Sequence, residues 1–185
     1  NIVAVEQSGS AGKYTMAIWA SEAGCEVTLE GLDVRQRITH TDDPQMDMIY
    51  TSGGTIIINS GNFVSGTPAW TLNCKDAAYK AGTANIIVKG GTFTGFDPAN
   101  NKAEGDNTSF VAAGYKSVDN NDGTYTVVKN ENVVAVIGTK EYATLEEATD
   151  AAAVSGSTVV LMADVTEEKW VGVESNVTLD LNGHS

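Results

Sequence analysis

Residues 86–95 read IIVKGGTFTG, a β-branched run followed by paired glycines and an aromatic residue. A similar order occurs at residues 56–66, IIINSGNFVSG, where Gly61 and Phe63 stand thirty residues before Gly91 and Phe93. β-Branched residues favour strands, and glycines favour tight turns. The spacing therefore predicts that copies of one strand-and-turn unit lie side by side, with their aromatic rings stacked inside.

Apolar alternation before a glycine recurs along the chain, in EVTLEGLDV at 26–34, TIIINSGNF at 55–63, NIIVKGGTF at 85–93 and NVTLDLNG at 176–183. Alternate residues of a strand point to the same side, so the Val, Leu and Ile side chains of these segments share one core. Shorter apolar pieces lie between them, in MAIWA at 16–20, DMIYT at 47–51 and AWTLNC at 69–74. Two or three short strands per repeat are typical of a parallel β-solenoid. An antiparallel sandwich is the alternative, but it explains the thirty-residue spacing poorly.

The sequence predicts two domains, one over residues 1–130 and one over 133–185. In the second, Thr144 and Glu147 form a capping box, in which each side chain bonds a backbone N–H at a helix start. Apolar side chains then recur at helical spacing up to Gly156. We expect a short helix that caps a solenoid end or leads a second unit; a plain connecting helix is the simpler interpretation.

The chain of 185 residues is acidic, with 24 Asp and Glu against 11 Lys and Arg and a net charge of −13. This charge disfavours nucleic acid as a partner, because phosphates would be repelled. The charge also disfavours acidic polysaccharides and anionic membranes, unless a divalent cation bridges them to the protein. Neutral glycans or proteins remain as possible partners. No stretch has the length of a transmembrane helix, so we expect no direct membrane insertion. Cys25 and Cys74 are expected to be buried free thiols.

Two parts of the chain resemble a known family. GGTFTGFDPANN at 90–101 with FVAAGYKSVDNNDGTYTVV at 110–128 resembles the closing part of pectate-lyase-like, right-handed β-helix domains in large surface proteins of gut bacteria. EYATLEEATDAAAVSGSTVVLMADV at 141–165 with VTLDLNGHS at 177–185 resembles the opening of such a domain. The resemblance covers residues 53–185 and implies an all-β, right-handed parallel β-helix (solenoid) with one short capping α-helix. The closing part precedes the opening part, which suggests a window across two consecutive units, or a unit whose last part stacks on a neighbouring copy.

The same resemblance sets the functional expectation. Related β-helices occur in phage appendages and in polysaccharide lyases and hydrolases, so the fold does not choose an activity. We expect a non-enzymatic structural or adhesive module of a bacterial surface protein or virion fibre, located outside the cell, at its surface or on a virion. The expected partners are other copies, stacked end to end, and a glycan or protein receptor. The alternative is a calcium-assisted polysaccharide lyase or a related carbohydrate-active enzyme.

Within the stretch DVRQRITHTDD, the candidates for catalysis are Arg35, Arg37, Asp42 and Asp43. Lyases of the resembling fold use acidic residues to hold calcium and a basic residue to take a proton. A strand with charges alternating on a solvated face explains the same pattern, and we expect no catalytic role. His40 and His184 are interpreted as loop and turn residues.

Two acidic stretches are candidates for calcium, FDPANNKAEGDN at 96–107 and VDNNDG at 118–123. The first holds Asp97, Glu104 and Asp106 without a fixed ligand spacing. The second is better explained by a hairpin turn at its Asp-Gly pair. No Cys and His cluster suggests zinc. We expect neither a metal nor a cofactor.

Aromatic side chains are the remaining binding candidates. Trp19, Tyr50 and Trp70 recur near corresponding strands, and aromatic faces bind sugar rings or protein partners. Stacking of these rings in the interior is the competing interpretation, because large aromatic side chains are mostly buried.

Overall fold

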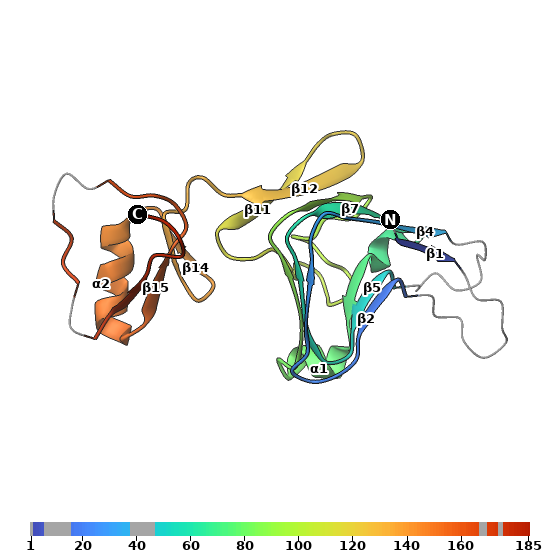
Figure 1. Ribbon diagram of the computed structural model, residues 1–185, viewed down its shortest axis with the longest axis horizontal. Helices are drawn as coiled ribbons and strands as arrows, with labels where there is room; N and C mark the ends of the chain where they lie inside the picture. Colours follow the sequence, from blue (N-terminus) through green and yellow to red (C-terminus); the bar gives the residue numbers. More distant parts are fainter. Residues whose placement is uncertain (1, 6–15, 38–46, 167–169, 174–175) are drawn as a thin grey trace. The chain divides into compact units, whose positions relative to one another are not determined.

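The computed structural model describes residues 2–5, 16–37, 47–166, 170–173 and 176–185. The chain divides into two compact units (Figure 1). The first unit comprises Asn1–Val111 and Lys116–Val128, and the second comprises Ala112–Tyr115 and Lys129–Ser185.

Three sheets are built from the strands that precede residue 130. The largest has the order β1-β4-β7-β10-β12-β11, with β1 (Ile2–Val5), β4 (Leu32–Arg37), β7 (Gly61–Val64), β10 (Gly91–Thr94), β12 (Thr124–Lys129) and β11 (Tyr115–Asp119). The second sheet contains β2 (Ile18–Ala20), β5 (Ile49–Thr51) and β8 (Leu72–Cys74). The third contains β3 (Glu26–Leu29), β6 (Gly54–Ile58) and β9 (Ala84–Val88).

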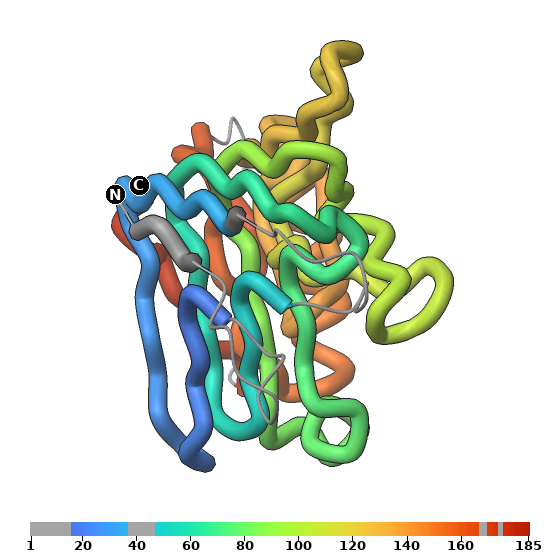
Figure 2. The backbone as a smooth tube through the Cα atoms, turned by 90° about the vertical axis from the view of Figure 1, so that its right-hand side faces the viewer, coloured from blue at the N-terminus to red at the C-terminus, as the bar shows by residue number. Residues whose placement is uncertain are grey.

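Three successive stretches of chain each give one strand to each of these sheets, and Figure 2 shows them side by side in blue, cyan and green. The strands contributed in this way are paired in parallel. Ile58 pairs with Leu29 on one side and Val88 on the other, and all three are buried. The pairing predicted from the thirty-residue spacing is therefore confirmed at these positions.

The aromatic rings that the sequence places one repeat apart are in contact. Phe63 and Phe93 pair in β7 and β10, both are fully buried, and their ring centroids lie 4.8 Å apart with 15° between the planes. Gly61 begins β7 with a φ of 146°, and a side chain there would collide with the carbonyl oxygen of Leu32. Glycine is needed at this turn because it carries no Cβ.

The predicted fold class, a right-handed parallel β-helix (solenoid) with one short capping α-helix, is wrong. The chain is mostly β, but its described residues form four separate small sheets of three to six strands, and among them parallel strands occur only in short runs. Pairing becomes antiparallel where β10 meets β12 and again around β13 (Ala135–Ile137). For β12, the cause lies in the turn between β11 and β12, where Asn121 and Gly123 have φ of 59° and 85°. Such a turn folds the chain back as a hairpin.

The second unit has a sheet and a helix of its own. The sheet has the order β14-β13-β15-β16, formed by β14 (Lys140–Tyr142), β13 (Ala135–Ile137), β15 (Thr158–Leu161) and β16 (Thr178–Asp180). The segment 176–183, expected to repeat the earlier strands, instead contains β16, which pairs in parallel with β15. Helix α2 (Leu145–Ser155) lies along this sheet (Figure 1) and buries Ala148 and Ala152 against it. It covers its own sheet rather than the end of a solenoid.

The ends of α2 follow the sequence prediction. The Thr144 hydroxyl accepts a hydrogen bond from the backbone N–H of Glu147 at 3.2 Å, and Gly156 ends the helix with a φ of 66°. These boundaries are confirmed. A second helix, α1 (Asp76–Lys80), follows β8. Neither of the α-helices in the described part of the chain is long and apolar enough to cross a membrane.

Candidate functional site

One side of the sheet β2-β5-β8 carries aromatic and polar side chains. In each of its strands a large apolar residue comes first and a small buried residue comes last. The middle residue points to the opposite side, because side chains alternate along a strand. These middle residues are paired in register, Trp19 with Tyr50 and Tyr50 with Asn73, and we call the three the outward row.

Two of the predicted aromatic candidates are thus neighbours in this row. Trp19 is 57% exposed, and its indole N–H donates a hydrogen bond to the Ser52 hydroxyl at 3.0 Å. Tyr50 is half-buried. The competing interpretation, stacking in the interior, does not hold for Trp19, since most of its ring faces solvent.

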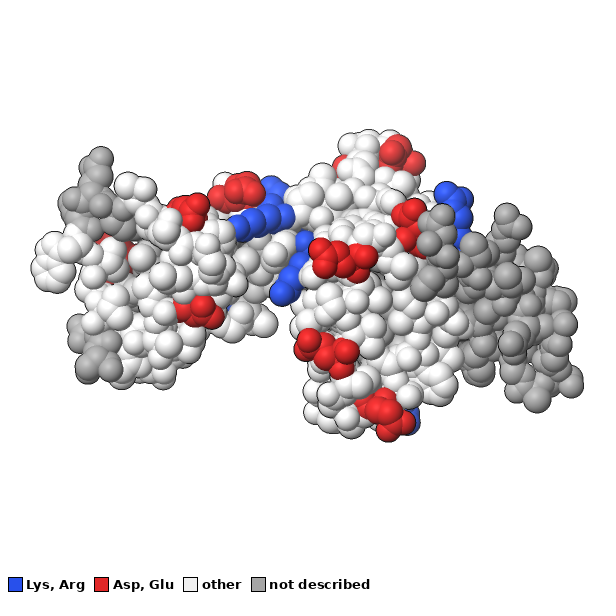
Figure 3. All heavy atoms as spheres, in the orientation of Figure 1, with Lys and Arg blue, Asp and Glu red and all other residues white. Residues whose placement is uncertain are grey.

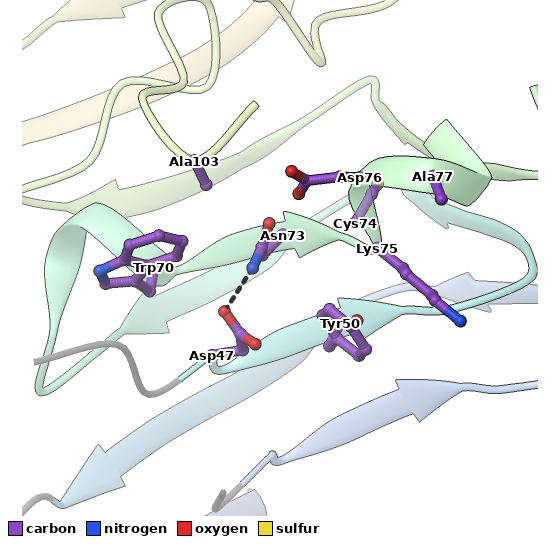
Figure 4. Close-up of a pocket in the computed structure, with 9 residues that line it drawn as sticks. All are labelled: Asp47, Tyr50, Trp70, Asn73, Cys74, Lys75, Asp76, Ala77 and Ala103. Carbon is purple, nitrogen blue, oxygen red and sulfur yellow. Dashed lines mark hydrogen bonds between the residues drawn. The ribbon is translucent and has the colours of Figure 1, made fainter. Parts of the chain in front are cut away.

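The third aromatic candidate, Trp70, ends the short 3-10 helix η1 (Pro68–Trp70) just before β8. Its backbone carbonyl accepts a hydrogen bond from the N–H of Met48 at 3.0 Å, and its own N–H donates to Thr67 at 2.9 Å. The backbone of Trp70 is therefore fixed on both sides. Its half-buried ring lies over the end of the outward row (Figure 4).

Tyr50 and Trp70 line the same open cleft, which has a volume of about 510 Å³. We call it the Trp70 cleft, and its walls include Asp47, Tyr50, Trp70, Asn73, Cys74 and Asp76. Figure 4 shows these side chains on β5, η1, β8 and the start of α1. Carboxylates and an amide therefore line the cleft together with two of the predicted aromatic residues.

Hydrogen bonds hold the polar groups of the cleft in place. The Asn73 amide donates to Asp47 Oδ1 at 2.8 Å, and the Asp47 backbone carbonyl accepts from the Gln36 amide at 3.2 Å. Behind the cleft, the backbone N–H of Cys74 donates to Glu104 Oε1 at 2.6 Å. These bonds tie β8 to the segment before β5 and to the loop that carries Glu104.

Acidic groups set the electrostatics of the cleft. Burial raises the pKa of Glu104, and the nearby Asp76 and Asp47 carboxylates raise it further, against the lowering effect of the Cys74 N–H. The pKa of Tyr50 is raised by burial and then by Asp47. Burial and Glu104 also raise the pKa of the Cys74 thiol, so this thiol stays protonated. The field in the cleft is negative.

The cysteines are free, as the sequence predicts, but only Cys74 is buried, whereas Cys25 is half-buried. Cys25 lies outside the walls of the cleft. Since the Cys74 thiol is both buried and protonated, it has the environment of an unreactive core cysteine rather than a nucleophile.

None of the candidates for lyase chemistry whose side chains the structure describes lines the Trp70 cleft. Arg35 is exposed on β4, in a different sheet, and Arg37 ends that strand. Asp42, Asp43 and His40 lie outside the described residues. His184 belongs to the second unit, where its Nδ1 is 3.3 Å from Asp164 Oδ1 and its Nε2 is 3.3 Å from Lys129 Nζ.

The acidic stretches considered for calcium have local partners. Asp97 accepts a hydrogen bond from the N–H of Ala99 at 2.9 Å, and Asp122 accepts from the N–H of Thr124 at 2.9 Å. Within the described ranges, no group of three or more His, Cys, Asp or Glu side chains is placed to hold a metal ion.

Sequence reasoning missed the polar residues Asp47, Asn73 and Asp76. A signal for Asn73 was present, since the order apolar, variable, small occurs three times, as Ile-Trp-Ala at 18–20, Ile-Tyr-Thr at 49–51 and Leu-Asn-Cys at 72–74. Aligning these triplets places Asn73 beside Tyr50. The last two triplets are 23 residues apart rather than thirty, which hides the match.

The site combines aromatic faces with hydrogen-bonding groups and an open entrance, an arrangement suited to holding a small polar ligand. No family model, curated protein or solved structure matches the chain. The resemblance to pectate-lyase-like domains of surface proteins therefore stays a prediction.

Proposed function

We propose that this protein is a non-catalytic adhesive module that binds a neutral glycan in the Trp70 cleft. The observation that carries the proposal is the pairing of two aromatic rings, Tyr50 and Trp70, with fixed polar groups in one open cleft. Sugars have apolar ring faces and many hydroxyl groups. Aromatic side chains match the faces, and side-chain amides and carboxylates match the hydroxyls.

The charges favour a neutral glycan over an acidic one. Asp47 and Asp76 line the cleft, and the negative field extends to Glu104 behind it. Carboxylate or sulfate groups of an acidic polysaccharide would be repelled there. On the face drawn in Figure 3, carboxylates are spread over the surface in several clusters, in keeping with the net charge of −13.

The proposed absence of catalysis rests on what surrounds the cleft. A lyase needs a basic group beside its acidic groups, positioned to take a proton. Among the described residues, Arg35 lies on another sheet, and the cation that lines the cleft, Lys75, has an exposed side chain. Figure 4 shows the Lys75 amine pointing away from Trp70.

The test is calorimetric titration with neutral oligosaccharides of glucose, mannose, galactose and N-acetylglucosamine, each from one to four sugars long. We expect at least one series to bind and Trp70→Ala to weaken it by about thirtyfold, since losing a central aromatic anchor costs about 2 kcal/mol. Trp170→Ala is the matched control, because Trp170 is 92% exposed and lies in the second unit. Absence of binding by every series, or equal binding by Trp70→Ala, would contradict the proposal.

The same samples test for catalysis. We expect no unsaturated product from pectin or alginate with calcium present, and no new reducing ends from the neutral series. Sustained turnover that disappears in Arg35→Ala would replace the adhesive function by a lyase.

As an adhesive module, the protein would act outside the cell, on a bacterial surface or a virion, and would associate with further copies. The sheet order leaves β16 and β14 as edge strands of the second unit. Unpaired edges can pair with another chain. Sedimentation velocity over a hundredfold range of concentration tests this association, and a single monomeric species throughout would count against it.

A further inference from the structure

A second cleft, of about 270 Å³, lies next to the Trp70 cleft in the first unit. We call it the Tyr125 cleft, and its walls include Ala69, Phe96, Asp97, Asn100, Lys102 and Tyr125. None of these residues lines the Trp70 cleft. The Tyr125 cleft is therefore a separate hollow with its own side chains.

The two clefts share a boundary made of consecutive residues. Ala69 lines the Tyr125 cleft and Trp70 lines the Trp70 cleft; likewise Lys102 lines the former and Ala103 the latter. Consecutive Cα atoms are only 3.8 Å apart, so two chain segments separate the clefts by the width of one residue. Each segment contributes an alanine and a larger residue to this boundary, Ala69 with Trp70 and Ala103 with Lys102. The alanines carry only a methyl group, so we take the part of the boundary that they form, the alanine ridge, as the place where a ligand passes.

The Tyr125 cleft offers the same kinds of contact with a balanced charge, because Asp97 and Lys102 both line it. Tyr125 is half-buried and paired in β12 with Phe93 of β10, so its backbone is part of the sheet. Phe96 is buried and forms the apolar floor. The exposed side chains of Lys102 and Asn100 supply hydrogen-bond donors, whereas carboxylates dominate the Trp70 cleft.

We infer that the two clefts are neighbouring subsites of one groove, which binds a neutral oligosaccharide of at least two sugar residues. One sugar lies against Trp70 and Tyr50, and the next crosses the alanine ridge to lie against Tyr125, with its hydroxyls bonded by Lys102 and Asn100. This inference rests on the proposed function, because it assigns the length of the ligand bound at the Trp70 cleft.

Chain length is the first test. In the neutral series that binds, the affinity of the wild-type protein should rise by about tenfold or more from the monosaccharide to the di- or trisaccharide, as a second contact is added to the first. This measurement needs no variant. Equal affinity at all lengths would overturn the groove and leave glycan binding at Trp70 standing, whereas absence of binding by every probe would remove both.

The ridge is the second test. Ala69→Phe should raise the boundary and reduce the gain with chain length to less than about twofold. Ala23→Phe, at an exposed alanine outside both clefts, is the matched control and should keep the full gain. Tyr125→Ala should also remove the gain, and it checks the result if Ala69→Phe lowers the melting temperature. A gain that survives both variants would overturn the inference.

Discussion

The stacked rings of Phe63 and Phe93 allow a quantitative test of the pairing between neighbouring strands. Both side chains are fully buried, and their centroid separation of 4.8 Å at 15° is a parallel stack. Phe→Leu at either position keeps an apolar side chain but removes the stack, and should cost about 1–3 kcal/mol. The ring interaction itself contributes about 0.5–1.5 kcal/mol beyond burial. The double variant should therefore cost less than the sum of the single variants by that amount.

Urea unfolding measures these differences. Trp19 and Trp70 lie in the first unit, so a Trp170→Phe background makes tryptophan fluorescence report on that unit alone. With a urea dependence of about 1–3 kcal/mol per molar, a loss of about 2 kcal/mol moves the midpoint by roughly 1 M.

The control pair is Phe63→Leu with Phe110→Leu, because the ring of Phe110 packs against Tyr79 instead. The centroids of those two rings lie 6.2 Å apart. Those two changes should add within about 0.5 kcal/mol. Additivity of Phe63→Leu and Phe93→Leu within the same margin would refute the stack.

Three further predictions concern the turn, the helix and the carboxyl group behind the cleft. Gly61→Ala should destabilise the first unit by about 1–3 kcal/mol, whereas Gly82→Ala in the same unit, where an added Cβ meets no atom within 4 Å, should cost less in the same urea assay; equal effects would refute the collision at Gly61. Thr144→Ala should cost the second unit about 0.5–2 kcal/mol by loss of the helix cap, and Thr144→Ser should restore most of it in thermal melts; a loss that Ser does not restore would exclude the cap as its cause. The pKa of Glu104 is raised above its ordinary 4.5 in the folded protein. Between pH 4.5 and this raised pKa, the folded protein holds a proton that the unfolded chain releases. The free energy of unfolding therefore falls as pH rises through this range. Glu104→Gln should flatten that dependence, and an identical pH profile would show that Glu104 does not cause it.

Local patterns in the sequence predicted local structure well. The period of two identified the buried rows that contain Ile58, and the thirty-residue spacing identified the Phe63 and Phe93 contact. The capping box at Thr144 identified the start of α2. Each of these features depends on residues close in sequence or at one constant spacing, so a simple pattern records it.

The course of the whole chain was not predictable in the same way. The Asp-Gly turn at 122–123 was recognised as a hairpin, but its consequence, antiparallel pairing of β12 with β10, changes the sheet from that point on. The apolar alternation around Val177 resembles the earlier strands, yet β16 pairs with β15 in another sheet. A strand's pattern states which side is apolar, and it does not state which neighbour the strand joins.

The candidate site shows the same limit. Tyr50 and Trp70 were identified from their type, and the structure brings them into one cleft. Glu104 was considered only for calcium, because nothing in the sequence shows that its carboxylate reaches the N–H of Cys74. Whether these residues bind a ligand stays a prediction.

In the sheet β2-β5-β8, the residues that stabilise the core are different from the residues available for binding. The flanking positions of β2, β5 and β8 maintain the core, while Trp19, Tyr50 and Asn73 point away from it. Substitutions of Trp19 and Tyr50 should therefore change what the surface binds with little loss of stability, whereas Asn73 also holds β8 to Asp47. The two aromatic positions form a natural site for a randomised library, from which binders of chosen sugars can be selected with the core unchanged.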